Sequence, residues 1–343
     1  MAGTPRKRGT PATIIDVAER AGVSMKTVSR VINNEPTVRE KTRDRVLSAV
    51  EALGYQRNVF ARGLRADRSL VLGLLYENPQ GDYPADVLHG ALAYCRLRGY
   101  HLVVEVLRGK NMGDQTTRFL SQTRLDGVFM TPPVCDNPFV LKACNSFGMP
   151  YIRISPRKPK KGERYIAIDD FAAAKDVTEY LLQLGHRRIA LIKGLPGHAA
   201  TILRLAGYKE ALRNATVEFD SDLIIDGDFH FQSGVDGARK LLALKQRPTA
   251  IFAGNDETAA GVLAYAHEEG VGVPEELSVC GFDGGTVSKV VWPRLTTVLQ
   301  PTPLLGETAV SILIGERDAD GTDAPIILPH KLIVGLSTAR PPR

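Results

Sequence analysis

Apolar positions recur at helical spacing in three short runs within the first sixty residues of the chain. A capping pair, Thr13 with Asp16, opens the first run, and Gly22 ends it. Ser24 follows at once and is placed to cap a second helix. Two short helices joined by a glycine-containing turn predict a helix-turn-helix. The apolar residues that would pack the two helices together are Ile14, Val17, Ala18, Ala21, Val28, Val31 and Ile32.

A third helix is predicted in the run TVREKTRDRVLSAVEALGY. Thr37 with Glu40 forms a second capping pair, and Gly54 ends the run. Three helices of this size would bury one small core, whose remaining members are Val46, Leu47, Val50 and Leu53.

From Leu70 onward, short apolar runs alternate with helical stretches. Runs such as LVLGLLY, HLVVEVL and AIFAGND have the length and composition of strands, and LVLGLLY is typical of a buried parallel strand. The alternation predicts doubly wound α/β modules with parallel sheets, and it occurs twice. A chain of 343 residues is also long enough for two or three domains.

Charge is unevenly distributed in a chain of otherwise ordinary composition, 43% hydrophobic and 24% charged. Residues 1–68 hold 14 Lys and Arg against 7 Asp and Glu, whereas the remaining residues hold 30 against 31. The net charge of +6 is therefore carried by the N-terminal segment. A basic head on a neutral body is typical of a protein that binds a polyanion.

Several classes of function are disfavoured. No apolar run is long enough to span a membrane, and the basic N-terminus lacks the apolar core of a signal peptide, so a cytoplasmic or nucleoid-associated protein is expected. The four cysteines are scattered, which predicts buried free thiols, and the seven histidines form no metal-ligand pair. We find no nucleophile elbow, phosphate loop or dinucleotide motif, so neither an enzyme nor a cofactor is expected.

The predicted second helix is the candidate DNA-binding element, although a generic three-helix bundle with a basic surface would share its pattern. The first residues of a recognition helix reach base edges in the major groove, where arginine suits guanine. The candidates for base contacts are Met25, Lys26, Thr27 and Arg30, and those for phosphate contacts are Thr13, Ser24, Ser29, Asn33, Thr42 and Arg43.

The chain resembles the lactose/galactose repressor (LacI/GalR) family of bacterial transcription regulators. The likeness is carried by TIIDVAERAGVSMKTVSRVINN, VREKTRDRVLSAVEALGYQRN and ARGLR in the head, and by LGHRRIALIKG, RLAGYKEAL, AIFAGNDETAAGVL, VPEELSVCGFDG and PRLTTVLQP in the body. It extends from about residue 12 to residue 340. Three positions depart from the family pattern: Arg57 replaces a proline, Gly284 a second aspartate, and Gly335 a frequent arginine.

The resemblance implies a body folded like periplasmic sugar-binding proteins, in which the chain crosses three times between two modules. We expect these crossings near Asp170, Gln300 and His330. The expected organisation is a basic tail (1–11), a helix-turn-helix domain (12–56), a hinge linker or helix (57–69), an N-terminal effector subdomain (70–170 and 301–330) and a C-terminal one (171–300 and 331–343).

The hinge RNVFARGLRADRS carries apolar residues that have no obvious core to enter. A helix begun by Asn58 and continued to Leu64 would be too short to be stable alone. We expect it to form on DNA, where two copies would pack through residues such as Ala61, while Leu64 enters the minor groove as a wedge and Arg62 meets phosphate.

A cleft between two parallel sheets collects residues from the carboxyl ends of strands, which is where ligands bind. Carboxylates, amides and an aromatic wall suit a polyhydroxylated ring. Asp256 is expected to be a helix cap and His198 loop surface, Trp292 fits either the pocket rim or the core, and Asp169 with Asp170 makes a poor acid–base pair. The candidate effector-binding residues, several of them implied by the resemblance, are Tyr76, Glu77, Asp170, Arg204, Phe229, Asn255, Asp283 and Gln300.

The leading hypothesis is a ligand-responsive repressor that binds a palindromic operator in double-stranded DNA as a homodimer and releases it when a sugar enters the cleft. The chain shows no heptad extension after STARPPR, which favours a dimer over a tetramer. A purine or other corepressor that tightens DNA binding is the alternative. A plain solute-binding protein is the third hypothesis, and the basic head argues against it.

Overall fold

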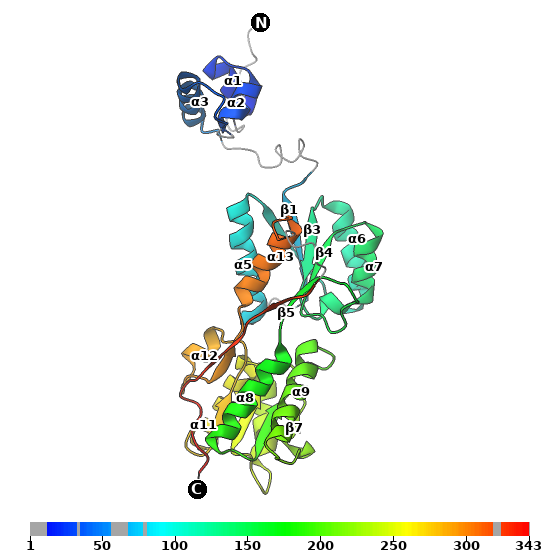
Figure 1. Cartoon of the computed structure of the whole chain (residues 1–343), viewed down its shortest axis with the longest axis vertical. Helices are drawn as coiled ribbons and strands as arrows, with labels where there is room; N and C mark the ends of the chain where they lie inside the picture. Colours follow the sequence, from blue (N-terminus) through cyan, green and yellow to red (C-terminus); the bar gives the residue numbers. More distant parts are fainter. Residues whose placement is uncertain (1–11, 33–34, 56–67, 78–80, 318–323, 343) are drawn as a thin grey trace. The chain divides into compact units, whose positions relative to one another are not determined.

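A computed structural model describes residues 12–32, 35–55, 68–77, 81–317 and 324–342 (Figure 1). The chain divides into two compact units, Met1–Asp67 and Arg68–Arg343, here called the head and the body. Within the described ranges, no helix combines the length and apolarity needed to cross a bilayer. Five candidate DNA-binding residues lie outside the described residues: Asn33, Asn58, Ala61, Arg62 and Leu64.

The head is the predicted three-helix domain, with α1 (Ile14–Ala21), α2 (Met25–Ile32) and α3 (Glu40–Leu53). The side chain of Asp16 accepts from the Thr13 amide at 2.6 Å, and Gly22 ends α1 in the left-handed conformation, as predicted. The core consists of Val17, Ala18, Ala21, Val28, Val31, Val46 and Ala49. Val50 and Leu53 pack against it, but the expectation for Leu47 was wrong, because its side chain is 49% exposed.

The connection between α2 and α3 differs from the prediction in one respect. Thr37 lies in a turn, and α3 begins at Glu40 with Arg39 at its N-cap, so the second capping pair was wrong. Arg45 of α3 instead ties the helices together, because its guanidinium donates to the carbonyl of Ala21 at 2.9 Å. That carbonyl is one of the unpaired acceptors at the end of α1.

The first sheet of the body has six parallel strands in the order β11-β5-β4-β3-β1-β2. Helices α5 and α13 pack together on one side of it, and α6 and α7 on the other (Figure 1). The strands are β1 (Val71–Tyr76), β2 (His101–Val106), β3 (Gly127–Met130), β4 (Tyr151–Ile154), β5 (Tyr165–Ile168) and β11 (Ile326–Leu328). The helices are α5 (Asp82–Arg98), η1 (Gly109–Asn111), α6 (Met112–Gln122), η2 (Val134–Asp136), α7 (Pro138–Ser146) and α13 (Thr302–Leu313).

The second sheet has four parallel strands in the order β7-β6-β8-β9, and two helix pairs, α8 with α9 and α10 with α11, cover it. Strands β10 and β12 pair antiparallel beside it. The strands are β6 (Ile189–Ile192), β7 (Ile224–Ile225), β8 (Ala250–Ala253), β9 (Ser278–Cys280), β10 (Thr297–Leu299) and β12 (Lys331–Ile333). The helices are α8 (Asp170–Leu184), α9 (Ala199–Asn214), η3 (Ser221–Leu223), α10 (Phe231–Leu242), α11 (Asp256–Glu268) and α12 (Thr286–Val290).

The chain passes between the two sheets at three places: from β5 into α8, from β10 into α13, and from β11 into β12. The C-terminal helix α13 therefore belongs to the first sheet although it follows the second in sequence. Its packing on α5 is close, because a Cβ at Gly306 would lie 2.0 Å from the carbonyl oxygen of Val87, and one at Gly90 would lie 1.9 Å from that of Pro303. Two glycines thus let the backbones of α5 and α13 meet directly.

All four cysteines are buried free thiols, as predicted. Burial raises the pKa of each thiol, to about 12 for Cys95 and about 11 for Cys144. Their thiolate fraction at neutral pH is therefore small, which is the property of packing cysteines rather than reactive ones.

Candidate functional site

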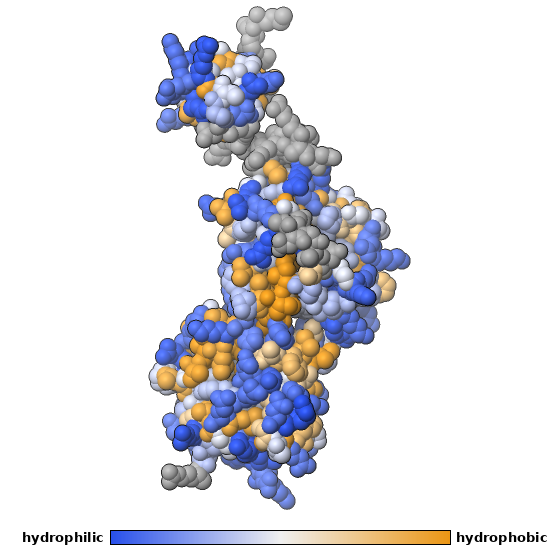
Figure 2. Space-filling model, viewed as in Figure 1, coloured by the Kyte–Doolittle hydropathy of each residue, from blue (hydrophilic) through white to orange (hydrophobic). Residues whose placement is uncertain are grey.

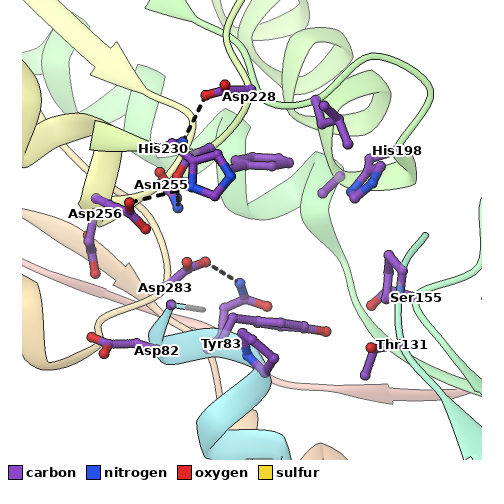
Figure 3. Close-up of a pocket in the computed structure, with 18 of the residues that line it drawn as sticks. Asp82, Tyr83, Thr131, Ser155, His198, Asp228, His230, Asn255, Asp256 and Asp283 are labelled. Atoms are coloured by element: carbon purple, nitrogen blue, oxygen red, sulfur yellow. Dashed lines mark hydrogen bonds and ion pairs between the residues drawn. The ribbon is translucent and has the colours of Figure 1, made fainter. Parts of the chain in front are cut away.

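A cavity of about 460 Å³ lies at the carboxyl ends of the strands, with lining residues from both modules of the body (Figure 3). Seven of the eight candidate effector-binding residues line it: Glu77, Asp170, Arg204, Phe229, Asn255, Asp283 and Gln300. Tyr76 does not. It is the last residue of β1 and only 8% exposed, and neighbouring residues in extended chain project to opposite sides.

Arg204 and Asp170 form a buried ion pair at the base of the cavity. The Arg204 Nε atom lies 2.8 Å from Oδ1 of Asp170, and their side chains are 7% and 5% exposed. Nη1 of Arg204 donates to the carbonyl of Gly254, and the guanidinium lies 3.4 Å from the ring centroid of Phe282. The guanidinium is thus fixed on three sides, and its Nη2 makes no hydrogen bond within the described residues. Planar, fixed donors of this kind suit a hydroxylated ligand.

Asp283 is held in an uncommon backbone conformation. Its φ is 112°, and its carboxylate accepts from the Gln300 side-chain amide at 2.6 Å. Gly284 follows with a φ of 69°, and a Cβ there would lie 2.7 Å from Cα of Leu299. A glycine therefore fits this turn, because an L-residue at position 284 would be strained and crowded.

Asp256 is not the expected helix cap. Asn255 caps α11, since its side chain accepts from the Thr258 amide at 2.9 Å. The Asp256 carboxylate is buried and accepts instead from the Thr297 hydroxyl at 2.6 Å and the Gly285 amide at 3.1 Å. Burial raises the pKa of Asp256, and the nearby carboxylate of Asp283 raises it further. Burial also raises the pKa of Asp283.

Phe229 also has a positive φ, of 71°, and the side-chain amide of Asn255 holds its carbonyl at 2.9 Å. Its ring lies on the backbone of Gly194, where any side chain would overlap it. Non-glycine residues in this conformation cluster at ligand sites, because the surrounding structure must hold them there. Phe229 therefore forms a fixed aromatic wall of the cavity.

His198 lines the cavity, so its expected place on the loop surface was wrong. Its ring centroid lies 5.9 Å from that of Phe229. Burial lowers the pKa of His198, which keeps the imidazole neutral near neutral pH. Its buried Nε2 atom has no hydrogen-bond partner among the described residues.

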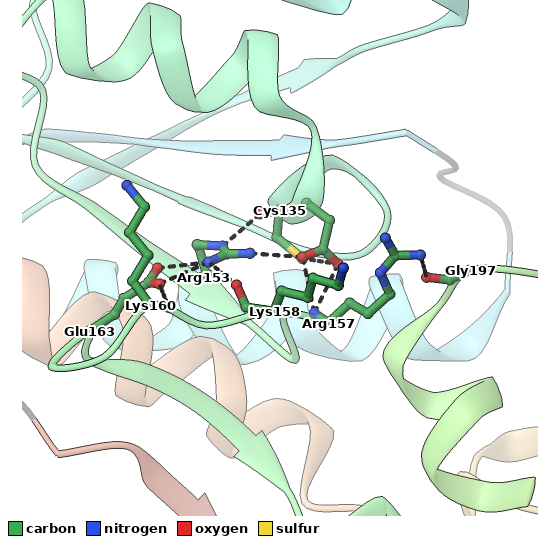
Figure 4. Close-up of polar contacts among 8 residues, drawn as sticks. Cys135, Arg153, Arg157, Lys158, Lys160, Glu163 and Gly197 are labelled. Carbon is green, nitrogen blue, oxygen red and sulfur yellow. Dashed lines mark hydrogen bonds and ion pairs between the residues drawn. The ribbon is translucent and has the colours of Figure 1, made fainter.

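Hydrogen bonds across the cleft join the two modules. Oδ2 of Asp82, at the start of α5, accepts from the amide of Val287 in α12 at 3.1 Å. Arg157 donates to the carbonyl of Gly197 at 3.4 Å (Figure 4). The buried Arg153 anchors the base of the loop that carries Arg157, because it forms ion pairs with Asp136 and Glu163. The hydrogen bonds of Asp82 and Arg157 thus hold the two modules together around the cavity.

Sequence reasoning missed several residues of this site. Asp82, Tyr83 and Pro84 follow the first strand closely, and a strand-end search that continued past Asn78 would have found them. Thr131 and Ser155 sit at the carboxyl ends of β3 and β4, where the same rule applies. Trp292 does not belong to the core, because it is 79% exposed, and it is not among the residues that line the cavity.

The candidate DNA-binding residues of the head lie on and around α2. Met25, Lys26 and Arg30 are exposed, Met25 by 51%, whereas Thr27 and Ser29 are half-buried. The Ser24 hydroxyl accepts from the Thr27 amide at 3.2 Å and so caps α2 as predicted. Thr13 is exposed at the start of α1, while Thr42 and Arg43 are half-buried in α3, with Arg43 donating to the carbonyl of Glu35 at 2.7 Å.

The described parts of the chain contain no group of three or more His, Cys, Asp or Glu side chains able to hold a metal ion. The side chains of Asp169 and Asp170 differ both in direction and in the contacts that they make. Asp169 caps α8 by accepting from the Ala172 amide, while Asp170 pairs with Arg204.

Comparison with known proteins agrees with this architecture. Residues 13–58 match the model of the bacterial regulatory proteins of the lacI family, and residues 178–338 match a periplasmic binding protein-like domain. Catabolite control protein A of Priestia megaterium is 31% identical over 332 residues, covering 95% of this chain and 99% of the relative. The HTH-type transcriptional repressor PurR of Vibrio atlanticus is 32% identical, covering 96% and 99%.

Two solved structures resemble the whole chain. A complex of the transcriptional regulator CelR with cellobiose superposes with a TM-score of 0.73 at 30% identity, covering 95% of this chain and 99% of that one. The lac repressor dimer bound to operator and the anti-inducer ONPF gives a TM-score of 0.82 at 27% identity, covering 96% and 100%. The relatives are transcriptional regulators rather than enzymes, and this chain belongs to the lacI family of DNA-binding bacterial transcriptional regulators.

Proposed function

We propose that the protein is a repressor that binds a palindromic operator as a homodimer and releases it when a sugar occupies the cavity of the body. The observation that carries the proposal is the cavity between the two modules, with a fixed guanidinium, two amides and an aromatic wall converging on it. Such a set of donors, acceptors and C–H surface suits a ring with many hydroxyl groups. The CelR–cellobiose complex gives the sugar assignment further support.

The exposed face of α2 is proposed to read the operator in the major groove. Arg30 is the residue best suited to a guanine, since its side chain is 47% exposed and its Nε lies 3.6 Å from Glu35, a weak surface pair that DNA can displace. Met25, Lys26 and Thr27 would complete the base contacts, and the predicted phosphate contacts remain Thr13, Ser24, Ser29, Asn33, Thr42 and Arg43.

Arg30→Ala is expected to weaken specific operator binding by about 1–3 kcal/mol, the value of one good contact between a side chain and a base. Fluorescence anisotropy with the operator and with a scrambled duplex would separate this loss from a general loss of charge. Arg45→Ala is the contrasting variant, because Arg45 holds the end of α1 and its loss should lower the melting temperature of the head. An unchanged preference for operator over scrambled DNA in Arg30→Ala would exclude the base contact.

Dimer formation is proposed to use an apolar patch on the second module, made of Val290, Trp292, Val334 and Leu336. These side chains are 72%, 79%, 59% and 43% exposed. They are brought together because the Leu336 amide donates to the carbonyl of Arg294, two residues after Trp292. Apolar side chains gather on the surface around α12 (Figure 2). Large exposed apolar groups in one place mark interaction surfaces, and a two-fold symmetric site on DNA requires a second copy of the chain.

Whether the ligand weakens or tightens operator binding depends on which conformation of the cleft it binds more tightly. A sugar that shifts the modules would move the hinge residues, including Asn58, Ala61, Arg62 and Leu64, away from their DNA-bound arrangement. A purine or other corepressor that tightens DNA binding is the second candidate, and it would act through the same cavity with the opposite sign.

The proposal is tested by gel shifts of the operator in the presence of mono- and disaccharides on one side and purines on the other. We expect a sugar to release the operator and purines to have no effect. Tighter operator binding with a purine would reverse the proposed sign. If deletion of residues 1–68 left operator affinity unchanged, DNA binding by the head would be excluded.

A further inference from the structure

The lining of the cavity is acidic beyond what a neutral sugar requires. It contains seven carboxyl groups, and among the described lining residues Arg204 is the single lysine or arginine. Arg204 is already paired with Asp170, so the other six carboxyl groups have no lysine or arginine partner within the described residues. The six are Glu77, Asp82, Asp228, Asp256, Glu257 and Asp283.

Four of these groups, Asp82, Asp256, Glu257 and Asp283, form what we call the acidic end of the cavity. Asp82, Asp256 and Asp283 lie on one side of the cavity, whereas Thr131, Ser155 and His198 lie on the other (Figure 3). A Cβ at position 81, on the cavity lining, would lie 3.7 Å from Oε2 of Glu257, so this carboxylate from α11 comes close to the start of α5. The two modules therefore contribute to the acidic end together.

The backbone leaves room for these carboxylates. A Cβ at Gly285 would lie 2.5 Å from Oδ2 of Asp82, and one at Gly281 would lie 2.2 Å from Oδ1 of Asp256. Both carboxylates thus occupy space that any other residue at the glycine positions would fill. The acidic end is a formed part of the cavity wall rather than a set of side chains extended into solvent.

The donors to Asp82, Asp256 and Asp283 are electrically neutral. Glu257 accepts from the Phe231 amide at 3.2 Å, and its Oε1 also lies 3.5 Å from Nδ1 of His230, which carries a charge only when protonated. Asp82 accepts from a backbone amide, Asp283 from the amide of Gln300, and Asp256 from a hydroxyl and a backbone amide. Neutral donors orient a carboxylate but carry no charge to balance its own, and within the acidic end Arg204 compensates part of the charge of Asp283 alone. Burial first, and then neighbouring carboxylates, raise the pKa values of Asp256 and Asp283, although Arg204 lowers that of Asp283. The charged forms of both groups are therefore disfavoured in the empty cavity, and a bound cation would stabilise them.

We propose that the effector is a hydroxylated ring that also carries a protonated amine, as in an amino sugar, and that phosphorylated sugars are excluded. This inference rests on the proposed function and narrows its ligand class. The ammonium group binds at the acidic end, and the ring lies beside Phe229. Hydroxyl groups at the far side meet Thr131, Ser155 and the unpartnered Nε2 of His198. A phosphate would place two negative charges among carboxylates in a partly enclosed site, where repulsion is stronger than in water.

The test is isothermal titration calorimetry of the full chain with matched ligands. The amines are glucosamine, galactosamine and the glucosamine disaccharide, and each is compared with its N-acetylated form and with the sugar that lacks the amine. The two monosaccharides are also compared with glucose 6-phosphate and galactose 6-phosphate. We expect at least one amine to bind about 10- to 100-fold tighter than its N-acetylated form, the range of one to two charge-assisted hydrogen bonds. The phosphates should give no heat at concentrations where the parent sugar does.

Variants locate the effect. In Asp82→Asn and Glu257→Gln combined, the ratio between amine and N-acetylated ligand should fall to about one. Glu268→Gln, at the far end of α11 and outside the cavity lining, is the matched control and should keep the ratio. Thermal melting confirms that each variant is folded, and the comparison of amine with N-acetylated ligand in the unchanged chain stands without any variant.

The inference is overturned if the N-acetylated, parent or phosphorylated ligands bind as tightly as the amines or more tightly. It is also overturned if the preference for the amine survives the double substitution, or if no amine binds at about 10 mM. These outcomes are separate from failure of the proposed function. A neutral sugar that binds and releases the operator would leave the repressor proposal intact while it excludes the ammonium site.

Discussion

Arg204→Ala is expected to lower the free energy of unfolding of the body by about 3–5 kcal/mol, because it leaves the carboxylate of Asp170 buried without its charged partner. The side chains of this pair are 7% and 5% exposed, so water cannot replace the lost guanidinium easily. The stacking of Arg204 on Phe282 is lost as well. Chemical denaturation of the purified body, residues 68–343, measures the effect.

A double variant separates stability from ligand binding. Asp170→Asn with Arg204→Met removes both charges and keeps much of the volume, so it should recover part of the lost free energy. It should still bind no effector, because the fixed donors of Arg204 and the acceptor of Asp170 are gone. An unfolding free energy within about 1 kcal/mol of the unchanged chain in Arg204→Ala would contradict the buried ion pair.

Trp292→Glu is expected to convert the proposed homodimer to a monomer and to weaken operator binding by about 100-fold or more. A carboxylate at a 79% exposed position costs the monomer little, whereas in an apolar interface two copies would bury like charges face to face. Loss of the second head removes the gain from simultaneous binding to two half-sites, which is about 10²–10⁴. Sedimentation velocity and operator titration measure the two effects.

Phe139→Glu is the matched control, because Phe139 is a 63% exposed aromatic residue on α7 outside the apolar patch. It should leave both the dimer and operator affinity unchanged. A Trp292→Glu variant that sediments as the unchanged chain does would move the interface elsewhere on the body.

Much of the fold could be predicted because its signals are local. Helix caps such as Thr13–Asp16 and the glycines that end α1 and α3 act within one turn, and the apolar strands of both sheets are continuous runs. Thr37 failed because a capping residue must directly precede its helix, and the chain makes an additional turn before Glu40.

The elements that were not predicted depend on distant partners. Strand β5 is short, and it pairs with β11, which lies more than 150 residues away in the sequence. The resemblance, and no local pattern, was what placed residues 301–330, with α13 and β11 among them, in the first module. Short strands and crossing helices gain their stability from tertiary contacts that no local pattern shows.

The candidate site shows the same division. Residues at strand ends, such as Asp170 and Asp283, could be placed by the topology of parallel sheets. Tyr76 could not, because the direction of a side chain at the last residue of a strand depends on where the strand ends. Asp82, His198 and Glu257 come from helix starts and loops, which only the packing of two modules brings to one cavity.

The central claim is that occupancy of the cavity controls operator binding. The most direct test is fluorescence anisotropy of an operator duplex, selected from random DNA with the full chain, titrated with protein in the absence and the presence of a saturating ligand that calorimetry has shown to bind. We predict a palindromic operator and an affinity that falls by at least about fivefold with ligand, the lower end of allosteric coupling. An operator affinity that stays the same at full ligand occupancy would contradict the claim.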